Sequence, residues 1–201
     1  MPLPETVSTF LAGDPLAAAD LNKILTNISY LDGKINSQIQ ISAGAMIQST
    51  TSGAAPGSAE MSTNKNNYIF MDFSNSGGKL YAEFGFELPS DYNSGTITFH
   101  ANWTANSTST NSVVWGLQAV SIADDESLDV AFGTAQEVTD ANKSTAYKRS
   151  KTSESSAITI AGTPAAGEQV RCRLYRDSGN GSDTLAATAR LMSIVISYTR
   201  T

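Results

Sequence analysis

The apolar residues of this chain follow a helical spacing in one early segment and an alternating spacing over most of the rest. In the early segment they recur at intervals of three, four, three and four residues, at Leu21, Ile24, Ile28, Leu31 and Ile35. This repeat places them on one seam of a helix, like the a and d positions of a coiled coil. Asp14 suits the N-cap and Pro15 the first helical position, whereas Gly33 weakens the helix by about 1 kcal/mol relative to Ala. The pattern predicts a helix with about two heptads.

Two arrangements of this helix would cover its apolar seam. The helix either packs on its own domain, or it joins a short parallel bundle with identical chains. A helix of this length is marginal alone in water, so it needs one partner or the other. The segment that follows has the composition of a tether rather than of a return turn, which favours the bundle. We therefore expect a bundle of identical chains held by the five seam residues, with Phe10 and Leu16 anchoring the N-terminal arm.

Composition divides the chain into three parts. Residues 1–41 are expected to form an extended arm, in which Pro2 and Pro4 disfavour helix, followed by the trimerisation and attachment helix. Residues 42–63 are predicted to be a linker, because they hold a run of Ser, Thr, Gly, Ala and Pro with little apolar content. Residues 64–201 are expected to form the main domain.

The main domain has large apolar positions that alternate with small or polar ones, which is the period of a β-strand. Strands are expected at 80–88, 96–105, 112–122, 128–132, 145–148, 157–160, 169–176 and 185–198. About eight or nine strands at this spacing, with turn residues between them, predict a mainly β fold. The expected architecture is an antiparallel β-sandwich of jelly-roll type. An immunoglobulin-type sandwich is the alternative, although it uses fewer strands.

Charge and composition narrow the functions open to the chain. Charged residues make up 16% of the 201 residues, against roughly 25% in average globular chains. The net charge is −6 and the pI is about 4.7, so the phosphate backbone of nucleic acid is not an expected partner. No apolar run approaches the roughly 18 residues that a membrane-spanning helix needs, and the start lacks the features of a secretory signal. We expect no membrane insertion.

Residues that carry chemistry are few. Cys172 is the one cysteine, which excludes an intrachain disulfide. It shares a strand face with Val170 and Leu174, which predicts a buried, inert thiol. His100 is the one histidine and lies in a predicted strand with no nucleophile motif to complete a catalytic set, so a structural role is expected. No phosphate-binding loop, dinucleotide fingerprint or zinc-protease motif is present. We expect no enzymatic activity, no metal and no cofactor.

Two acidic groups leave alternatives open. The first contains Asp124, Asp125, Glu126 and Asp129, and a pair of carboxylates can hydrolyse glycosidic bonds. Asp is common in turns for local reasons, which argues against a polysaccharide depolymerase. The second group lies in the loop from Asp177 to Asp183, which could supply oxygen ligands to calcium but lacks the EF-hand spacing.

Two parts of the chain resemble proteins of tailed bacteriophages. Residues 10–22, Phe-Leu-Ala-Gly-Asp-Pro-Leu-Ala-Ala-Ala-Asp-Leu-Asn, are similar to the segment that precedes the trimeric stalk in many tail-fibre proteins. A family of small jelly-roll domains in phage virion proteins is similar to this chain at residues 86–96, 115–119, 133–136, 176–185 and 194–198. Together the two resemblances cover most of the chain except the linker. They imply a trimeric structural protein of the virion.

The resemblance implies a location and partners. The protein would be assembled in the host cytoplasm into the virion, and its N-terminal arm would bind tail or capsid subunits. One role is a short tail fibre or receptor-binding protein, and the other is a capsid decoration (cement) protein that stabilises the head. In the first role a host surface glycan is a further partner, and Tyr92 and Tyr147 are expected to stack on sugar rings as exposed loop aromatics. A sandwich adhesin unrelated to phages is the alternative outside this class.

Overall fold

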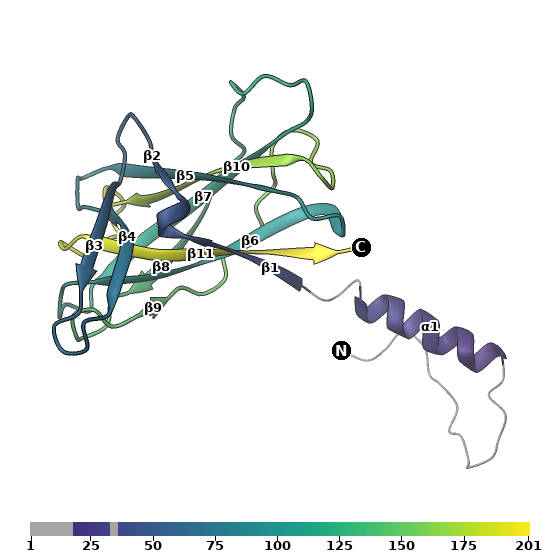
Figure 1. Ribbon diagram of the computed structural model, residues 1–201, viewed down its shortest axis with the longest axis horizontal. Helices are drawn as coiled ribbons and strands as arrows, with labels where there is room; N and C mark the ends of the chain where they lie inside the picture. Colours follow the sequence, from purple (N-terminus) through teal and green to yellow (C-terminus); the bar gives the residue numbers. More distant parts are fainter. Residues whose placement is uncertain (1–17, 33–35) are drawn as a thin grey trace, which may run out of the picture.

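The structure is a computed structural model that describes residues 18–32 and 36–201 (Figure 1). These ranges contain one α-helix, α1 (Ala18–Asp32), and one 3-10 helix, η1 (Ala43–Ala45). The strands are β1 (Asn36–Ser42), β2 (Ile47–Gln48), β3 (Ala55–Glu60), β4 (Asn67–Phe73), β5 (Lys79–Glu87), β6 (Tyr92–Ala105), β7 (Ser112–Ile122), β8 (Gln136–Ala141), β9 (Ser150–Lys151), β10 (Gln169–Asp177) and β11 (Ala189–Arg200). They form a six-stranded and a five-stranded antiparallel sheet, which confirms the predicted mainly β sandwich.

The strand order identifies the sandwich as jelly-roll-like. The six-stranded sheet has the order β3-β4-β11-β6-β9, and β1 also pairs with β11. The five-stranded sheet has the order β2-β5-β10-β7-β8. Strands β4 to β11 thus form two four-stranded layers, 4-11-6-9 and 5-10-7-8, which is the arrangement of two nested Greek keys.

The core lies between the two sheets because large apolar residues alternate along each strand. In β6, Phe99 and Trp103 point inward and are fully buried. Trp103 packs against Trp115 of β7 with ring centroids 6.1 Å apart, and Trp115 meets Phe73 of β4 edge-on at 5.0 Å. Aromatic pairs in such geometries contribute about 0.5–1.5 kcal/mol beyond the area they bury. This aromatic cluster therefore ties the two sheets together.

The segment predicted to be a linker, residues 42–63, belongs to the sandwich. Within it, β2 pairs with β5 and β3 pairs with β4. β1, which falls almost wholly in the part predicted to be arm and helix (residues 1–41), also belongs to the sandwich, because it pairs along its whole length with β11, from Asn36 opposite Thr199 to Ser42 opposite Ser193. The predicted jelly-roll boundary at residue 64 is therefore wrong, and the sandwich begins at Asn36. The side chains of this segment carry little β signal. Its strands form nonetheless, because the ladder uses backbone groups and Pro56 lies in an edge strand, where proline is tolerated.

The long predicted strands are present, whereas the short predicted segments do not form strands. The strands expected at 80–88, 96–105, 112–122, 169–176 and 185–198 correspond to β5, β6, β7, β10 and β11. Residues 128–132 and 145–148 form loops, and 157–160 makes only a bridge from Ile158 to Ile97. Tyr147 has a φ of +60°, a left-handed conformation that a strand cannot contain. Short apolar runs predict strands poorly, because they carry too few positions to define a period.

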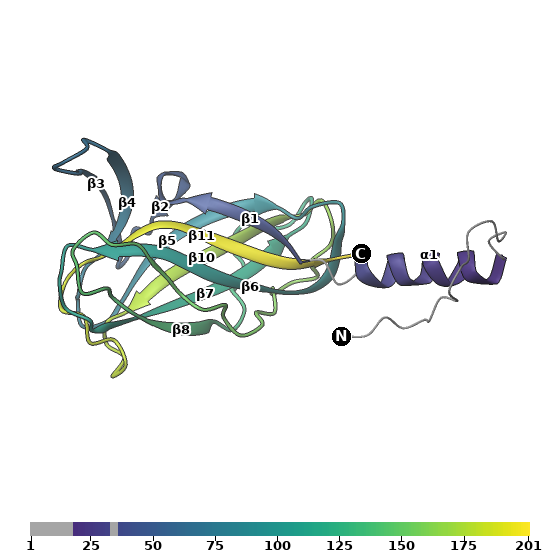
Figure 2. The same ribbon diagram turned by 90° about the horizontal axis from the view of Figure 1, so that it is seen from below.

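The two ends of the sandwich differ in character. α1 lies beyond the end at which β11 finishes, close to the C-terminus, and it points away from both sheets (Figures 1 and 2). The β3–β4 hairpin projects at the opposite end (Figure 2). The fold thus separates a helical end from a hairpin end.

Candidate functional site

Of the five predicted seam residues, Leu21, Ile24 and Ile28 have described side chains, and all three lie on α1. Leu21 is 46% exposed and Ile28 is 57% exposed, and Ile24 between them is half-buried. Leu25, which follows Ile24 in the sequence and was not part of the heptad pattern, is 55% exposed. The side chains of the other predicted interface residues lie outside the described part of the chain; these residues are Phe10, Leu16, Leu31 and Ile35.

Neither sheet covers this seam. In both views α1 runs outward from the end of the sandwich rather than along one of its faces (Figures 1 and 2). Packing of the helix on its own domain, one of the two arrangements considered above, is therefore not formed by the described residues. The seam is a surface that a partner can cover.

A cleft lies at the other end, between the β3–β4 hairpin and the outer face of the six-stranded sheet. We call it the hairpin cleft. Its volume is about 210 Å³, and it is lined by Met61, Tyr68, Phe70, Thr104, Tyr147, Arg149 and Met192. These residues come from β4, β6, β11, the turn of the hairpin and the loop between β8 and β9. The topology thus brings together residues that are far apart in the sequence.

Two aromatic rings of the hairpin cleft contact the guanidinium of Arg190. Tyr68 and Phe70 stack with ring centroids 6.0 Å apart and an interplanar angle of 20°. The Arg190 guanidinium lies 5.4 Å from the Phe70 ring centroid and 5.9 Å from that of Tyr147. An Arg190 nitrogen is 3.5 Å from the Asp72 carboxylate. Asp72 thus holds the Arg190 guanidinium, and cation–π contacts hold the rings of Phe70 and Tyr147 against it.

Tyr147 lines the cleft in a backbone conformation that is unusual for its type. Its φ is +60°, which bulky side chains rarely adopt. Its N–H donates to the carbonyl oxygen of Ala105 at 2.8 Å, which fastens the loop to the end of β6. Strained residues of this kind gather at binding and catalytic sites. Tyr147, one of the two residues expected to stack on sugar rings, thus lines a surface depression.

Tyr92, the second predicted stacking residue, is not available to a ligand. It is 3% exposed, its ring packs edge-on against Tyr198 at 6.2 Å, and its hydroxyl donates to the Gly95 carbonyl. Burial raises the pKa of this phenol. The prediction was wrong because Tyr92 begins β6 and turns into the core, where the sequence suggested a turn.

A second depression, of about 750 Å³, lies on the outer face of the five-stranded sheet. There Arg171 and Arg173 both bond the Glu83 carboxylate, at 3.2 and 2.9 Å, and Arg173 lies 4.4 Å from the Phe132 ring centroid. Burial alone would raise the pKa of Glu83, but the Arg173 and Arg171 hydrogen bonds outweigh it and hold the pKa below its ordinary value. Both arginines here thus share one carboxylate.

The two residues singled out for possible reactivity are held within the fold. Cys172 is fully buried, as predicted, and burial raises the pKa of its thiol, which keeps the sulfur protonated. His100 is 5% exposed, and its Nδ1 lies 3.1 Å from a Glu154 carboxylate oxygen. Thr98 also donates to Glu154. These contacts give the histidine the structural role expected from its strand position.

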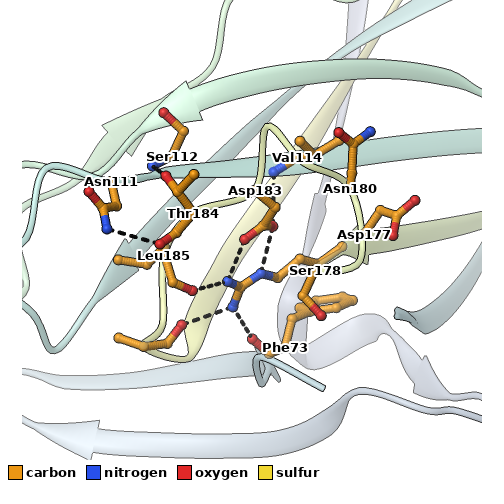
Figure 3. Close-up of polar contacts among 12 residues, drawn as sticks. Phe73, Asn111, Ser112, Val114, Asp177, Ser178, Asn180, Asp183, Thr184 and Leu185 are labelled. Atoms are coloured by element: carbon orange, nitrogen blue, oxygen red, sulfur yellow. Dashed lines mark hydrogen bonds and ion pairs between the residues drawn. The ribbon is translucent and has the colours of Figure 1, made fainter. Parts of the chain in front are cut away.

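The loop from Asp177 to Asp183 is organised by an arginine (Figure 3). Arg176 Nε and Nη2 donate to Asp183 at 2.9 and 2.7 Å, with both side chains at most 1% exposed. Arg176 Nη1 also donates to the carbonyl oxygens of Phe73 and Ala187, at 3.0 and 2.9 Å. Asp177 instead pairs with Lys79 at 3.6 Å. The two carboxylates thus serve different cations and do not converge on a calcium site.

The acidic group at residues 124–129 forms a turn. The Glu126 carboxylate accepts the Ala123 N–H at 2.9 Å, and Ser127 accepts the Asp129 N–H at 3.1 Å. Across residues 18–32 and 36–201, no three His, Cys, Asp or Glu side chains gather in a way that could hold a metal ion. In the same ranges, no helix is both long and apolar enough to cross a membrane.

Comparisons with known proteins give a likeness of fold. No protein-family model matches the chain, and none of the curated proteins is significantly similar to it in sequence. Among solved structures, the CBM36-1 domain of a multidomain xylanase from the hindgut metagenome of Trinervitermes trinervoides shares 11% identity, with a TM-score of 0.41, over 80% of this chain and 96% of that one. The mannan-recognising carbohydrate-binding module TmCBM27 shares 9% identity, with a TM-score of 0.38, over 83% and 99%.

A viral structure is similar to the same degree. The structure of the infectious bursal disease virus Gx strain shares 10% identity, with a TM-score of 0.36, over 82% of this chain and 32% of that one. Likenesses of this size occur between β-sandwiches in general. They assign neither a family nor a ligand to this chain.

Proposed function

We propose that the chain is a non-enzymatic structural protein on the surface of a tailed-phage virion. In this proposal it is a homotrimeric short tail fibre or receptor-binding protein, attached to other virion proteins through its N-terminal segment. The observation that carries the proposal is the apolar seam of α1: Leu21 and Ile28 are about half exposed, and the helix extends away from both sheets (Figure 2). A helix of this kind is stable only with partners.

A threefold bundle gives the seam the burial that it lacks. Leu21, Leu25 and Ile28 are each about half exposed in one chain, and full burial of such a side chain contributes about 1.5–3 kcal/mol. The spacing of three and four residues matches the knobs-into-holes packing of parallel helices. Other copies of this chain are the partners that present the same seam in register.

The arrangement of the two ends supports the attachment role. If α1 and the arm before it dock on the particle, the β3–β4 hairpin at the opposite end points outward (Figure 2). The hairpin cleft, which this hairpin borders, then also faces outward. Three copies side by side would then present three clefts to one surface, and multivalent contact raises avidity by about 10²–10⁴. The cleft is thus suited to host contact.

The first test is the mass of the purified protein in solution by light scattering. We expect three times the chain mass of 21.2 kDa. Ile28→Asp would place three carboxylates in the bundle, each costly to desolvate, so this variant should have the mass of one chain and an unchanged thermal unfolding of the sandwich. Asn22→Asp is the matched control, because Asn22 is exposed next to the seam and this change adds the same charge outside it.

Three outcomes decide between the alternatives. A monomeric full-length protein, or an Ile28→Asp variant that stays trimeric, would contradict the trimeric seam. If the trimer is found, quantitative mass spectrometry of purified particles separates the two virion roles. A copy number comparable with that of the major capsid subunit would assign the protein to capsid decoration rather than to a tail fibre.

A further inference from the structure

The hairpin cleft contains one cation that no carboxylate neutralises. Arg149 Nε and Nη2 donate to the amide oxygen of Asn102, at 3.2 and 2.5 Å. Among the described residues, no Asp or Glu forms an ion pair with Arg149, whereas the neighbouring Arg190 is paired with Asp72 at 3.5 Å. Lys65 on the hairpin is likewise paired, with Glu60 at 3.5 Å. The cleft therefore carries local positive charge on a chain whose net charge is −6.

The Arg149 guanidinium is oriented by a buried amide. Asn102 is 7% exposed, and its Nδ2 donates to the hydroxyl oxygen of Ser193 at 3.1 Å, which fixes which way its oxygen points. That oxygen accepts both hydrogen bonds from the Nε–Nη2 edge of the guanidinium. The end edge, with the N–H groups of Nη1 and the second N–H of Nη2, has no partner among the described residues. Two parallel N–H donors of this kind match the two oxygens of a carboxylate.

Apart from Thr104, whose hydroxyl donates to the Lys148 carbonyl oxygen at 2.8 Å, the rest of the lining consists of aromatic and methionine side chains. Tyr68 and Phe70 stack on each other, Tyr147 faces the same space, and Met61 and Met192 complete the walls. Aromatic rings that carry a hydroxyl accept ligands with one apolar face and polar edges. A pyranose ring has such a form, with C–H groups on its face and hydroxyls on its rim. The cleft thus suits a sugar ring better than a flexible acidic peptide.

The volume sets the size of the ligand. The hairpin cleft holds about 210 Å³, below the roughly 300–1,000 Å³ of pockets for drug-sized molecules, so it has room for about one sugar ring. A second depression, of about 380 Å³, shares Met61 and Tyr147 with it and continues along the hairpin turn past Asn64. The next unit of a linear saccharide could lie there.

We infer that the hairpin cleft binds a carboxylated saccharide, with the end edge of Arg149 on the carboxylate and the rings of Tyr68 and Tyr147 against the sugar. Phe70, which is 2% exposed, supports Tyr68 from below by stacking with it. One unmatched cation suits a carboxylate with one negative charge better than a phosphate monoester, which carries about −1.5 to −2. The inference deepens the receptor-binding role proposed above. It rests on that role only where it takes the sugar to come from the host surface. Binding itself requires one chain.

The test is isothermal titration of the full-length protein with three carboxylated probes: a galacturonic acid trisaccharide, a glucuronic acid disaccharide and sialyllactose. At least one is expected to bind, more weakly as salt is added. Its carboxyl-reduced counterpart should bind about tenfold more weakly or not at all, as expected for a lost charge-assisted hydrogen-bond pair. Glycerol phosphate, which is a phosphate monoester, serves as the phosphate probe.

Variants then assign the binding to the cleft. Arg149→Gln should weaken binding of the carboxylated probe about tenfold or more and leave the carboxyl-reduced probe unaffected, while Arg149→Lys should give an intermediate value because it keeps the charge and loses the fork. Lys143→Gln is the matched control, because Lys143 is exposed in the same loop and does not line the cleft. Thermal unfolding of each variant verifies that the sandwich is intact.

Each result has a defined meaning. Loss of binding in Arg149→Gln but not in Lys143→Gln, with both folded, supports the inference. Failure of all three carboxylated probes overturns it, as does equal binding by Arg149→Gln or preferential binding of glycerol phosphate. A trimer that binds none of the sugars leaves the proposed assembly standing, and a monomer that binds one through Arg149 overturns the trimer alone.

Discussion

At the residue scale, the fold depends on a few buried polar groups whose partners the sequence does not name. Arg176 and Asp183 are seven residues apart and almost fully buried, and together they close the loop between β10 and β11 (Figure 3). Asp183 also accepts the Val114 N–H at 3.1 Å, which fastens the loop to β7. Such a pair contributes mainly by avoiding an unpaired charge in the core. Its loss should therefore cost more than a surface pair would.

The prediction at this scale concerns Asp183→Asn. The change leaves the Arg176 guanidinium buried without a counter-charge, and we expect the free energy of unfolding to fall by about 3–5 kcal/mol. Asp177→Asn, which removes the partly exposed pair with Lys79, is the control and should cost at most about 1 kcal/mol. Urea unfolding followed by fluorescence of the buried Trp103 and Trp115 measures both. Equal losses in the two variants would show that burial of the pair does not matter.

At the element scale, β1 extends the six-stranded sheet as an additional edge. It pairs with residues 193–199 of β11, and Ile39 and Ile41 pack against the core from one of its faces. Without β1, this part of the β11 edge would be open to solvent, and open edges invite pairing with other chains. β1 is thus part of the folding unit, although α1 next to it is not packed on either sheet.

The prediction at this scale compares two shortened chains. Removal of residues 1–35 keeps every strand and should leave the unfolding free energy of the sandwich within about 0.5 kcal/mol, as for changes away from packed features. Removal of residues 1–42 also deletes β1 and the burial of its two isoleucines, each worth about 1.5–3 kcal/mol, so we expect a loss of about 3 kcal/mol and a tendency to aggregate. If both chains are equally stable, β1 contributes nothing to the sandwich.

At the scale of the whole molecule, assembly and ligand contact are assigned to opposite ends. α1 lies beyond one end of the sandwich, and the β3–β4 hairpin lies at the other (Figures 1 and 2). The hairpin cleft is bordered by that hairpin. Changes at sites this far apart, with no shared partners, usually have independent effects. Trimerisation would therefore raise avidity for a surface without altering the affinity of one cleft.

The prediction at this scale is that a substitution in the seam does not change ligand affinity and that a substitution in the cleft does not change assembly. Ile28→Asp should leave the dissociation constant for the carboxylated probe in solution within about twofold, because sites without shared partners act independently. The same variant should bind a surface coated with that saccharide about 10²-fold more weakly than the trimer, through lost avidity. Arg149→Gln should leave the trimer mass unchanged. A large change in the solution affinity of Ile28→Asp would show instead that the two ends are coupled.

The sequence by itself determined the elements whose side chains repeat with a clear period. The 3-4 spacing from Leu21 to Ile28 predicted α1, and the alternation in residues 80–88 and 112–122 predicted β5 and β7, because burial of one face imposes that period. The buried position of Cys172 followed from the same alternation. The seam on α1 is the part of the candidate interface that the sequence located.

Only the tertiary structure decided what depends on contacts between distant segments. β1 and β3 form through backbone pairing with β11 and β4, which weak side-chain patterns do not reveal. The hairpin cleft assembles Tyr68, Tyr147 and Arg149 from separate strands and loops, and the Asn102 amide that orients Arg149 lies 47 residues away in the chain. Tyr92 and Tyr147 looked alike in the sequence, but one turns into the core and the other lines the cleft, because only packing fixes the direction of a loop side chain.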